Sequence, residues 1–575
     1  MTTAELVNGR ISLETDWRER DLVRQVPGTK WDRETRLWSL PLSWANCLTL
    51  RGVFGDELEL GPELAAWGFR ELETRIEPAM EARARAMDPA QDTEGDPRLF
   101  SYQRTGVEFL YRAECAVLAD DMGTGKTVQS VMTLERANAY PALIVCPNSV
   151  KRTWADEFAK WAPHRKVVVV SGSATKRRKL LAEDADVFVV NYESMRLHTR
   201  LAGYGSIRLL DKEKEPGELN RMWGAVVADE AHRVKAPKAK QTRALWAIGE
   251  TALRRLCLTG TPVANDPADF WTLLRFVSPK EWPSRSKFID RYCATAFNPF
   301  GGVDVVGLKP ETRDEFFRVV EPRFLRRQKA IVLPQLPPKV YVRRSVELAP
   351  KQAKVYKSLR DGMVAELDSG TIESFDSLSL LTRLSQAACA YPVVEEQEQE
   401  DGSVKKVITE LVDPSAKLDA LDDILAETDE PVVVFAASRK LIELASARLT
   451  KRGVEHACIT GTVSEQDRDI AKARFQAGGL KVLLLTLGAG AAGLTLTAAP
   501  TLVFLQRSWS LVENRQAEDR IHRPGAEKWE SVTIIDIVAE DTIEDNVADA
   551  LEGKSDMLEQ VTRDTETLRK LLCGD

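Results

Sequence analysis

The sequence predicts an α/β protein with two tandem parallel-sheet lobes. Short aliphatic runs such as ALIVCP and GAVVAD alternate with helix-length segments from about residue 99, and a second series of this kind starts near residue 416. Almost uninterrupted apolar strands separated by helices are typical of a parallel sheet that helices cover on both faces. The length of 575 residues also indicates several domains.

We expect six parts along the chain. The N-terminal residues mix short β-like runs with many Trp and Arg, and the breaker-rich DPAQDTEGDP indicates an exposed linker. The region between the two strand series loses their rhythm and is expected to be mostly helical with Pro-rich joints. The parts are an α+β module (1–75), a helix and linker (76–98), the first lobe (99–265), helical insertions with a bridging segment (266–415), the second lobe (416–545) and a helical C-terminal tail (546–575).

Composition excludes several classes of protein. The chain is 43% hydrophobic and 29% charged, with a formal net charge of −7, which excludes a disordered polyelectrolyte and a collagen-like chain. No two of the 8 cysteines form a CxxC pair, so we expect a reducing compartment and no local zinc knuckle. The start of the chain has no apolar run behind a basic head, which indicates a cytoplasmic protein without a signal peptide.

One uncharged segment, 482–505, is long enough to satisfy a length rule for a membrane helix. However, three glycines and Pro500 interrupt it. This pattern favours two buried strands that are joined by a functional loop, so we expect no transmembrane segment.

A glycine-rich loop in LADDMGTGKTVQS stands between an aliphatic strand and a helix. The backbone N–H groups of Gly123 and Gly125 can surround phosphate oxygens at a helix N-terminus, whose dipole favours anions. Lys126 would then reach the β- and γ-phosphates, and the Thr127 hydroxyl would bind Mg²⁺. Asp120 stands where the strict phosphate-loop pattern has its first glycine.

Two acids, Asp229 and Glu230, follow the aliphatic strand GAVVAD. An acid at the carboxyl end of a parallel strand faces the ligand-binding edge of the sheet. We expect Asp229 to hold Mg²⁺ through water and Glu230 to orient or deprotonate the attacking water.

The third motif is QAEDRIHRPG, near the end of the second strand series. Arg520 and Arg523 have the i, i+3 spacing that places both on one face if the segment is helical. Arginines that reach a γ-phosphate from a separate lobe stabilise the charge of the transition state. An ordinary salt-bridged surface helix is the alternative for this motif taken alone.

In this order the motifs resemble those of SWI/SNF-type DNA translocases of helicase superfamily two, from about residue 99 to 550. The resemblance implies two RecA-like lobes that use ATP and Mg²⁺ to move along DNA. It implies nucleotide contacts from Gln103, Asp121, Met122, Gly123, Thr124, Gly125, Lys126, Thr127, His232 and Gly493, Mg²⁺ ligands at Thr127, Asp229 and Glu230, catalytic roles for Lys126, Glu230, Arg520 and Arg523, and DNA contacts from Lys151, Arg152, Trp154, Asn191, Thr259 and Thr261.

The N-terminal segment VRQVPGTKWDRETRLWSLPL resembles the HARP domain of annealing helicases. This resemblance implies binding to branched or partly unwound DNA. Arg33 and Arg36 would contact phosphates, and Trp31 and Trp38 would stack on unpaired bases. The alternative, in which the tryptophans form the core of a small domain, stays open.

The expected function is that of a monomeric, DNA-dependent ATPase that moves along duplex or branched DNA with little regard to base sequence. It would remodel or anneal DNA structures in repair, recombination or replication, in a prokaryotic cell or a virus-infected host. An RNA helicase, a restriction-type motor subunit and a passive fork-binding protein with a vestigial ATPase are the alternatives. Turnover of ATP in the presence of duplex DNA, compared with RNA, distinguishes them.

Overall fold

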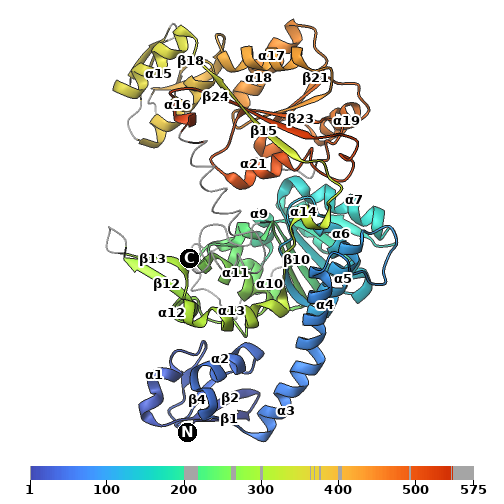
Figure 1. The fold of residues 1–575 in the computed structure, drawn as a ribbon, viewed down its shortest axis with the longest axis vertical. Helices are drawn as coiled ribbons and strands as arrows, with labels where there is room; N and C mark the ends of the chain where they lie inside the picture. Colours follow the sequence, from blue (N-terminus) through green and yellow to red (C-terminus); the bar gives the residue numbers. More distant parts are fainter. Residues whose placement is uncertain are drawn as a thin grey trace. The chain divides into compact units, whose positions relative to one another are not determined.

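Two parallel sheets form the centres of two units of the chain (Figure 1). The computed structural model describes residues 2–199, 218–260, 267–297, 302–362, 364–367, 370–373, 377–398, 404–490, 494–545 and 547. Of these, the residues up to Leu333 belong to unit 1 and those from Pro334 onward to unit 2. The predicted C-terminal tail, 546–575, lies outside the described residues except for Val547.

The N-terminal module is a small sheet covered by short helices. Its strand order is β3-β4-β2-β1-β5, with β1 and β2 joined by a tight turn at Asn8 and Gly9, where φ is 51° and 72°. Alternate residues of β1 and β2, such as Ala4, Ile11 and Leu13, are fully buried in its core. The elements are β1 (Thr2–Val7), β2 (Arg10–Glu14), α1 (Arg20–Val23), β3 (Lys30–Trp31), β4 (Trp38–Pro41), α2 (Trp44–Phe54) and β5 (Leu58–Leu60).

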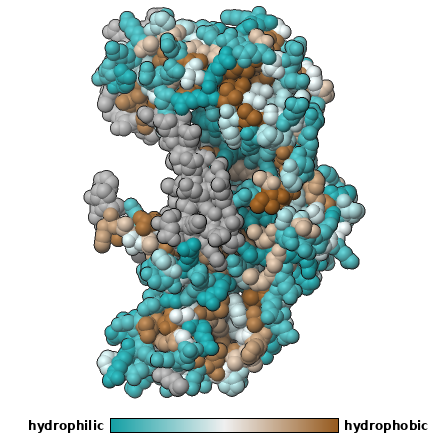
Figure 2. Space-filling model, in the orientation of Figure 1, coloured by the Kyte–Doolittle hydropathy of each residue, from teal (hydrophilic) through white to brown (hydrophobic). Residues whose placement is uncertain are grey.

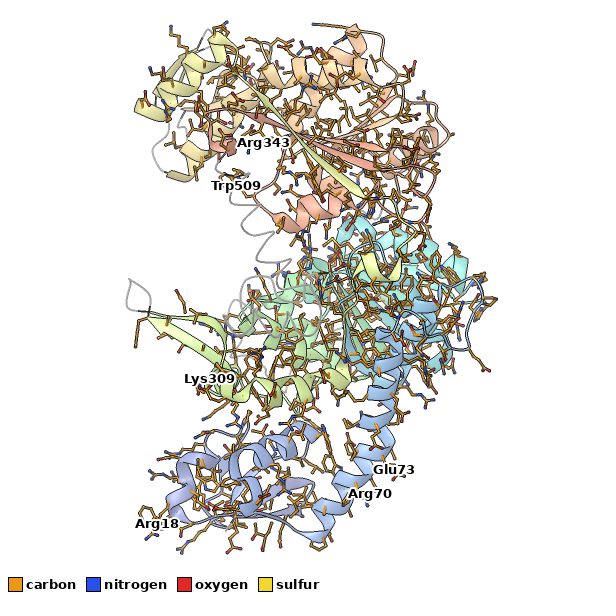
Figure 3. All side chains as sticks on the ribbon, in the orientation of Figure 1. Arg18, Arg70, Glu73, Lys309, Arg343 and Trp509 are labelled. Atoms are coloured by element: carbon orange, nitrogen blue, oxygen red, sulfur yellow. The ribbon has the colours of Figure 1, made fainter. Side chains whose placement is uncertain are left out.

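A continuous helical stretch follows the module, as the sequence predicts for the region from about residue 63 to 87. It consists of α3 (Pro62–Glu71), a π-helical turn η3 (Leu72–Ile76) and α4 (Glu77–Met87). Pro62 suits its place in the first turn, since its missing N–H would have no partner there. Arg70 and Glu73, both exposed, are labelled on this stretch in Figure 3.

Unit 1 contains a sheet of seven parallel strands in the order β14-β6-β11-β10-β7-β9-β8. Helices cover both faces, because alternate residues of β7 pack in different clusters: Leu143 and Val145 in one, Ala142 and Ile144 in the other. The strands are β6 (Cys115–Leu118), β7 (Ala142–Cys146), β8 (Val167–Val169), β9 (Val187–Asn191), β10 (Trp223–Asp229), β11 (Ala252–Leu258) and β14 (Phe324–Leu325). The helices are α5 (Ser101–Ala113), α6 (Lys126–Ala137), α7 (Lys151–Trp161), α8 (Ala174–Leu181), α9 (Tyr192–Met195), α10 (Lys240–Gly249) and α11 (Pro267–Val277).

The region predicted to be mostly helical contains strands as well. Besides helices it has three antiparallel strand pairs, and Lys309 lies at the base of the first of them (Figure 3). The prediction of a mostly helical region therefore omits these strands. The helices are α12 (Arg285–Tyr292), α13 (Arg313–Val320), α14 (Lys329–Val332), α15 (Pro350–Gly362) and α16 (Ser377–Cys389), and the pairs are β12 (Cys293–Phe297) with β13 (Val303–Leu308), β16 (Val364–Leu367) with β17 (Gly370–Glu373), and β18 (Tyr391–Glu398) with β19 (Val404–Val412).

The N-terminal module is joined to the rest of unit 1 by buried polar contacts. Tyr292 of α12 donates its hydroxyl to Glu315 of α13 (2.8 Å) and lies 3.2 Å from the hydroxyl of Thr49 of α2. Arg291 pairs with Glu315 at 2.5 Å, and both side chains are at least nine-tenths buried. A Cβ atom at Gly52 would lie 2.4 Å from the Glu315 carboxylate, so only glycine fits there. The module is thus part of the same packed unit.

Unit 2 contains a sheet of six parallel strands in the order β15-β24-β23-β20-β22-β21. Its strands are β15 (Lys339–Val346), β20 (Val432–Ala436), β21 (His456–Ile459), β22 (Val482–Thr486), β23 (Thr501–Gln506) and β24 (Val532–Ala539). Its further helices are α17 (Ala416–Glu427), α18 (Arg439–Lys451), α19 (Glu465–Gln476), α20 (Leu487–Gly490) and α21 (Leu511–Glu518).

The uncharged segment 482–505 contains two of these strands, β22 and most of β23, as predicted. Among the described residues, none of the helices has the length and apolar character that a membrane crossing requires. The face in Figure 2 is mostly hydrophilic, with hydrophobic residues in scattered patches. Such scattered patches are ordinary for a folded surface.

Candidate nucleotide site and arginine segment

The glycine-rich loop connects β6 to α6 at the carboxyl edge of the first sheet. Gly123 and Gly125 have φ values of 78° and 80°, which other residues rarely adopt. A Cβ atom at Gly125 would also lie 2.4 Å from Gln103 Nε2. Within the described part of the chain no side chain caps the N-terminus of α6, so its first N–H groups remain for an anion, which the helix dipole favours. The loop therefore fits a phosphate group.

Lys126, the first residue of α6, extends back over this loop. Its Nζ donates to the carbonyl oxygens of Asp120 (2.7 Å) and Asp121 (3.0 Å). An ammonium group held at this place is positioned to exchange carbonyl oxygens for phosphate oxygens. The structure thus brings Lys126 and the loop together, as predicted from their spacing.

Gln103 of α5 lies against the same loop. Its Nε2 donates to the carbonyl of Thr124 (3.1 Å), and its Oε1 accepts from the backbone N–H of Phe100 (3.1 Å). Tyr102 also donates its hydroxyl to the Thr124 carbonyl (2.9 Å). These bonds hold the loop from one side. The adenine contact expected of Gln103 stays a prediction.

The two acids lie at the end of β10, on the same edge of the sheet. Asp229 accepts a hydrogen bond from Trp154 Nε1 (2.8 Å) and another from the backbone N–H of Glu230 (3.0 Å). Burial, followed by the charge of Glu230, raises the pKa of Asp229 to about 6, while Trp154 and Lys126 act in the opposite direction. Lys126 and Asp229 are therefore close enough to influence each other electrostatically.

His232 connects the acids to the neighbouring strand. Its Nδ1 lies 3.3 Å from the Thr259 hydroxyl, just after β11, and 3.3 Å from a Glu230 carboxylate oxygen. Burial lowers the pKa of His232 to about 4, so the ring is neutral at pH 7. A neutral ring can accept or donate within this network without adding charge beside the acids.

The donor set fits Mg²⁺ better than a transition metal. Among the described residues no group of three or more acid, histidine or cysteine side chains is placed to hold a metal ion. Thr127, Asp229 and Glu230 offer oxygen atoms only. Mg²⁺ prefers oxygen ligands and is commonly bound by one or two carboxylates together with substrate phosphates.

Four of the side chains predicted to contact DNA are largely buried, and their DNA contacts stay a prediction. Trp154 is 1% exposed and forms part of the core, and Lys151 donates to the Val170 carbonyl (3.2 Å). Asn191 donates to Glu193 (2.7 Å), and Thr259 is fully buried. Asn191 is the last residue of β9 and Thr259 directly follows β11, whereas Lys151 and Trp154 lie on the buried face of α7.

The remaining predicted DNA contacts divide into three groups. Arg152 is exposed, and Thr261 lies outside the described residues. In the N-terminal module, Trp31 is 49% exposed and its ring meets the edge of the Trp38 ring at a centroid distance of 5.2 Å. Trp38 itself packs on the module core, whereas Arg33 and Arg36 are exposed. Trp38 thus fits the alternative of a core residue, and the stacking role of Trp31 stays a prediction.

In unit 2 the helix α21 ends at Glu518, before both predicted arginines. The expectation of a shared helical face for Arg520 and Arg523 is therefore wrong. Pro524 disfavours helical backbone at Arg523, and the helix has already ended in a turn.

The arginine segment is instead held by its own turn and by the residues after Gly493, which itself lies outside the described residues. Arg523 Nε donates to the Asp519 carbonyl (2.7 Å), and its Nη1 lies 3.4 Å from the Thr495 hydroxyl. The backbone carbonyl of Arg520 accepts from the N–H of Leu496 (2.8 Å). Arg520 is 5% exposed.

Sequence reasoning misses one prominent ion pair of unit 1. Asp120, fully buried, accepts two hydrogen bonds from Arg327, at 3.1 Å and 2.5 Å. A buried carboxylate needs a partner, so an acid in place of the usual loop glycine was a signal for a buried base. The pair of arginines in FLRRQK, directly after an apolar run, is the matching signal.

Comparisons with known proteins agree with this geometry. Residues 102–392 match the SNF2-related domain, and residues 416–525 match the helicase conserved C-terminal domain. The ISWI chromatin-remodeling complex ATPase ISW1 of Saccharomyces cerevisiae is 27% identical, over 82% of this chain and 41% of its own length. An uncharacterized ATP-dependent helicase of Mycoplasma pneumoniae is 27% identical, over 80% of this chain and 42% of its own.

The chain spans about two fifths of the length of these relatives. Among solved structures, the Sulfolobus solfataricus SWI2/SNF2 ATPase core in complex with dsDNA is 24% identical, with 84% of this chain and 98% of that chain covered and a TM-score of 0.38. The SNF2-related domain model alone covers half of the sequence. The chain therefore belongs to the SNF2-related family, with a helicase conserved C-terminal domain after the SNF2-related domain.

Proposed function

We propose that this protein is a DNA-dependent ATPase that translocates on duplex or branched DNA. The observation that carries the proposal is the arrangement at the carboxyl edge of the first sheet, where the loop with Lys126 follows β6 and Asp229 ends β10. An uncapped helix N-terminus, a lysine and an acid pair are the groups that hold and cleave a nucleoside triphosphate.

The residues of unit 1 would bind and orient ATP. The loop N–H groups and Lys126 would hold the phosphates, and Gln103 would face the adenine. Thr127, Asp229 and Glu230 would hold Mg²⁺, which when bound neutralises phosphate charge. Glu230, which has His232 beside its carboxylate at 3.3 Å, would orient the attacking water.

Arg520 and Arg523 would supply positive charge to the transition state. Guanidinium groups remain protonated and present several N–H donors, so they suit the oxygens of a transferring phosphoryl group. In unit 2 both arginines are held by backbone contacts rather than by a flexible helix end. This support favours a positioned role over a free surface charge.

One relative and the N-terminal module support the proposal that the protein moves along DNA. ISW1 is the ATPase of a chromatin-remodeling complex, and chromatin contains duplex DNA. Trp31 presents an exposed ring beside the exposed Arg33 and Arg36, as a surface for unpaired bases and phosphates requires. We propose contacts mainly with phosphates, and hence little sequence preference.

The proposed biological role is the remodelling or annealing of DNA structures by a monomer in the cytoplasm, during repair, recombination or replication. The six domain boundaries given above belong to this proposal. A HARP-like role of the module in recognising forked DNA is the most specific part of this proposal.

The test compares ATP turnover with single-stranded DNA, duplex DNA, forked DNA and duplex RNA. Duplex or forked DNA should raise kcat most, and RNA should have little effect. A Trp31→Ala, Arg33→Ala variant should lose the preference for forked DNA while keeping stimulation by plain duplex. Equal stimulation by RNA would favour the RNA helicase, and unstimulated turnover would favour the vestigial ATPase.

A further inference from the structure

The chain between the two sheets, residues 326–339, is here named the connector. It leaves the first sheet after β14 and enters the second at Lys339, the first residue of β15. Side chains at both of its ends bind residues that lie beside the groups assigned to ATP hydrolysis. Each set of contacts lies within one unit.

The first anchor is Arg327, which is 4% exposed. Its guanidinium donates twice to the fully buried Asp120 carboxylate (3.1 and 2.5 Å) and once to Gln129 Oε1 of α6 (2.8 Å). The backbone carbonyl of Asp120 accepts from Lys126 Nζ (2.7 Å). One residue therefore binds the connector through its side chain and Lys126 through its backbone.

Asp121 repeats this arrangement. Its carboxylate accepts from Arg326 Nη2 (3.2 Å) and from the backbone N–H of Lys329 (2.9 Å). Its carbonyl is the second acceptor of Lys126 Nζ (3.0 Å). Both loop residues that hold Lys126 are thus held by the connector.

The packing around Arg327 leaves its side chain little freedom. A Cβ atom at Gly106 of α5 would lie 2.0 Å from Gln129 Oε1 and 2.7 Å from Arg327 Nη2. Close-packed interiors transmit displacements instead of absorbing them. A shift of the connector at Arg327 would therefore shift the loop.

The second anchor lies in unit 2. Lys339 Nζ lies 3.3 Å from Glu518 and 3.4 Å from Asp519, and the hydroxyl of Tyr341 donates to Glu518 (2.9 Å). The Asp519 carbonyl accepts from Arg523 Nε (2.7 Å). The acid that binds the connector is thus also the residue that orients Arg523.

A further contact strengthens this end. His522, which directly precedes Arg523 in the sequence, donates its Nε2–H to the carbonyl of Pro337 (2.9 Å). Three prolines, Pro334, Pro337 and Pro338, lie between the two anchors. Proline fixes φ, so this part of the connector is stiff for its length.

We propose that the connector is a positioning element that couples the Lys126 loop to the Arg523 segment. Phosphate binding draws Lys126 away from the carbonyls of Asp120 and Asp121, and these residues pass the change to Arg327 and along the connector to Lys339 and Asp519. The proposal rests on the ATP turnover and DNA stimulation proposed above.

The sharpest test lengthens the connector without touching either anchor. Inserting Gly-Ser-Gly-Ser after Gln335, which is exposed, keeps every contact described above. We expect unchanged dissociation constants for nucleotide and DNA, within about twofold, and a kcat with DNA that falls about tenfold or more, because a small misplacement of catalytic groups is costly.

Gln335→Ala is the matched control for the insertion and should behave as the wild type. An insertion variant with wild-type kcat would overturn the proposal. If DNA fails to stimulate even the wild type, the proposed function fails instead. The basal kcat of the insertion variant then decides: a fall of about tenfold supports coupling, and an unchanged rate overturns it.

A second test separates positioning from mere stability. Lys339→Met removes the ammonium but keeps the length of the side chain, and Lys339→Arg restores the charge. We expect Lys339→Met to lower kcat about fivefold or more at unchanged KM for ATP, and Lys339→Arg to recover most of it. Equal kcat in Lys339→Met and the wild type, with only a lower unfolding temperature, would contradict the second anchor.

Discussion

The two ends of the connector hold charge in different ways. In unit 1, the Arg327 side chain is 3% exposed and its planar fork meets the Asp120 carboxylate with two hydrogen bonds. In unit 2, the Lys339 side chain is 22% exposed and shares one ammonium between Glu518 and Asp519. A guanidinium fork fixes direction as well as charge, whereas an ammonium is a point charge on a flexible stem.

The connector therefore fixes the orientation of the loop more tightly than that of the arginine segment.

The buried acids of the two units also differ. Burial dominates at Asp229 and raises its pKa to about 6. At Glu518 burial acts in the same upward direction, but Lys339 and Arg507 outweigh it and lower the pKa. Asp229 of unit 1 therefore lacks full compensation, as a cation site requires, whereas Glu518 of unit 2 is compensated by its basic neighbours.

The largest effect is expected from a substitution in the glycine-rich loop of unit 1. Lys126→Ala should abolish measurable ATP hydrolysis, because the loop loses the group that reaches the β- and γ-phosphates, while DNA binding stays mostly intact. Steady-state turnover and DNA binding by fluorescence anisotropy check this. Lys280→Ala, at an exposed lysine of the same unit, is the control, and unchanged turnover in Lys126→Ala would refute the assignment.

The second largest effect is expected from a substitution in the arginine segment of unit 2. Arg523→Ala should keep nucleotide affinity but lose DNA-stimulated turnover by about 10³-fold, since an arginine finger acts on the transition state. Nucleotide titration and stimulated kcat measure the two quantities separately. The control is Arg474→Ala, at an exposed arginine whose guanidinium lies 3.5 Å from Glu455. Wild-type stimulation would remove Arg523 from the mechanism.

A smaller effect concerns the partner of Asp229. Trp154→Phe keeps an aromatic ring in the core but removes the N–H that donates to Asp229. The Mg²⁺ concentration at half-maximal turnover should rise about tenfold, as is common when a partner of a metal ligand is lost. DNA affinity should not change. Trp161→Phe, which loses a similar bond to Glu157 on the same helix, is the control. Weakened DNA binding in Trp154→Phe would instead support the predicted contact of Trp154 with DNA.

The smallest effect is on stability. The pKa of Asp229 is higher in the folded state, about 6, than its usual 3.8, so the folded state binds more protons between these values and loses stability as the pH rises through them. Without nucleotide and Mg²⁺, Asp229→Asn should therefore stabilise unit 1 above pH 6 by about 3 kcal/mol, and the gain should vanish below pH 3.8.

Thermal unfolding across this pH range measures the gain. Asp156→Asn, at an exposed acid of α7, is the matched control. A gain that persists at low pH would show that the ionisation of Asp229 is not its cause.

Sequence reasoning predicts most strands of both sheets because most of them are short, mostly apolar runs between breakers. It misses β15, in which Lys339, Arg343 and Arg344 interrupt the apolar pattern. It fails in the region after the first lobe, where β12 and β13 pair although neither has a long apolar run. Pairing of such strands depends on the helices beneath them, and no local pattern records that.

At the site, Lys126 and Asp229 could be predicted because their chemistry depends on local order: strand, loop, helix. The burial of Trp154 and Lys151 could not, because tryptophan serves both cores and binding surfaces and a buried lysine is rare. The Arg327–Asp120 pair spans 207 positions of sequence. Only the fold decides which of many arginines meets a given buried acid.

The contact of Gly52 with Glu315 has a consequence for the ancestry of the chain. A module that adheres through exposed side chains can be gained or lost freely, but here Thr49 and Gly52 close over Tyr292 and Glu315 of the enzyme core. Without them a buried acid would open to water. Loss of the first sixty residues would therefore require compensating changes in α12 and α13, so descendants should keep or replace both partners together.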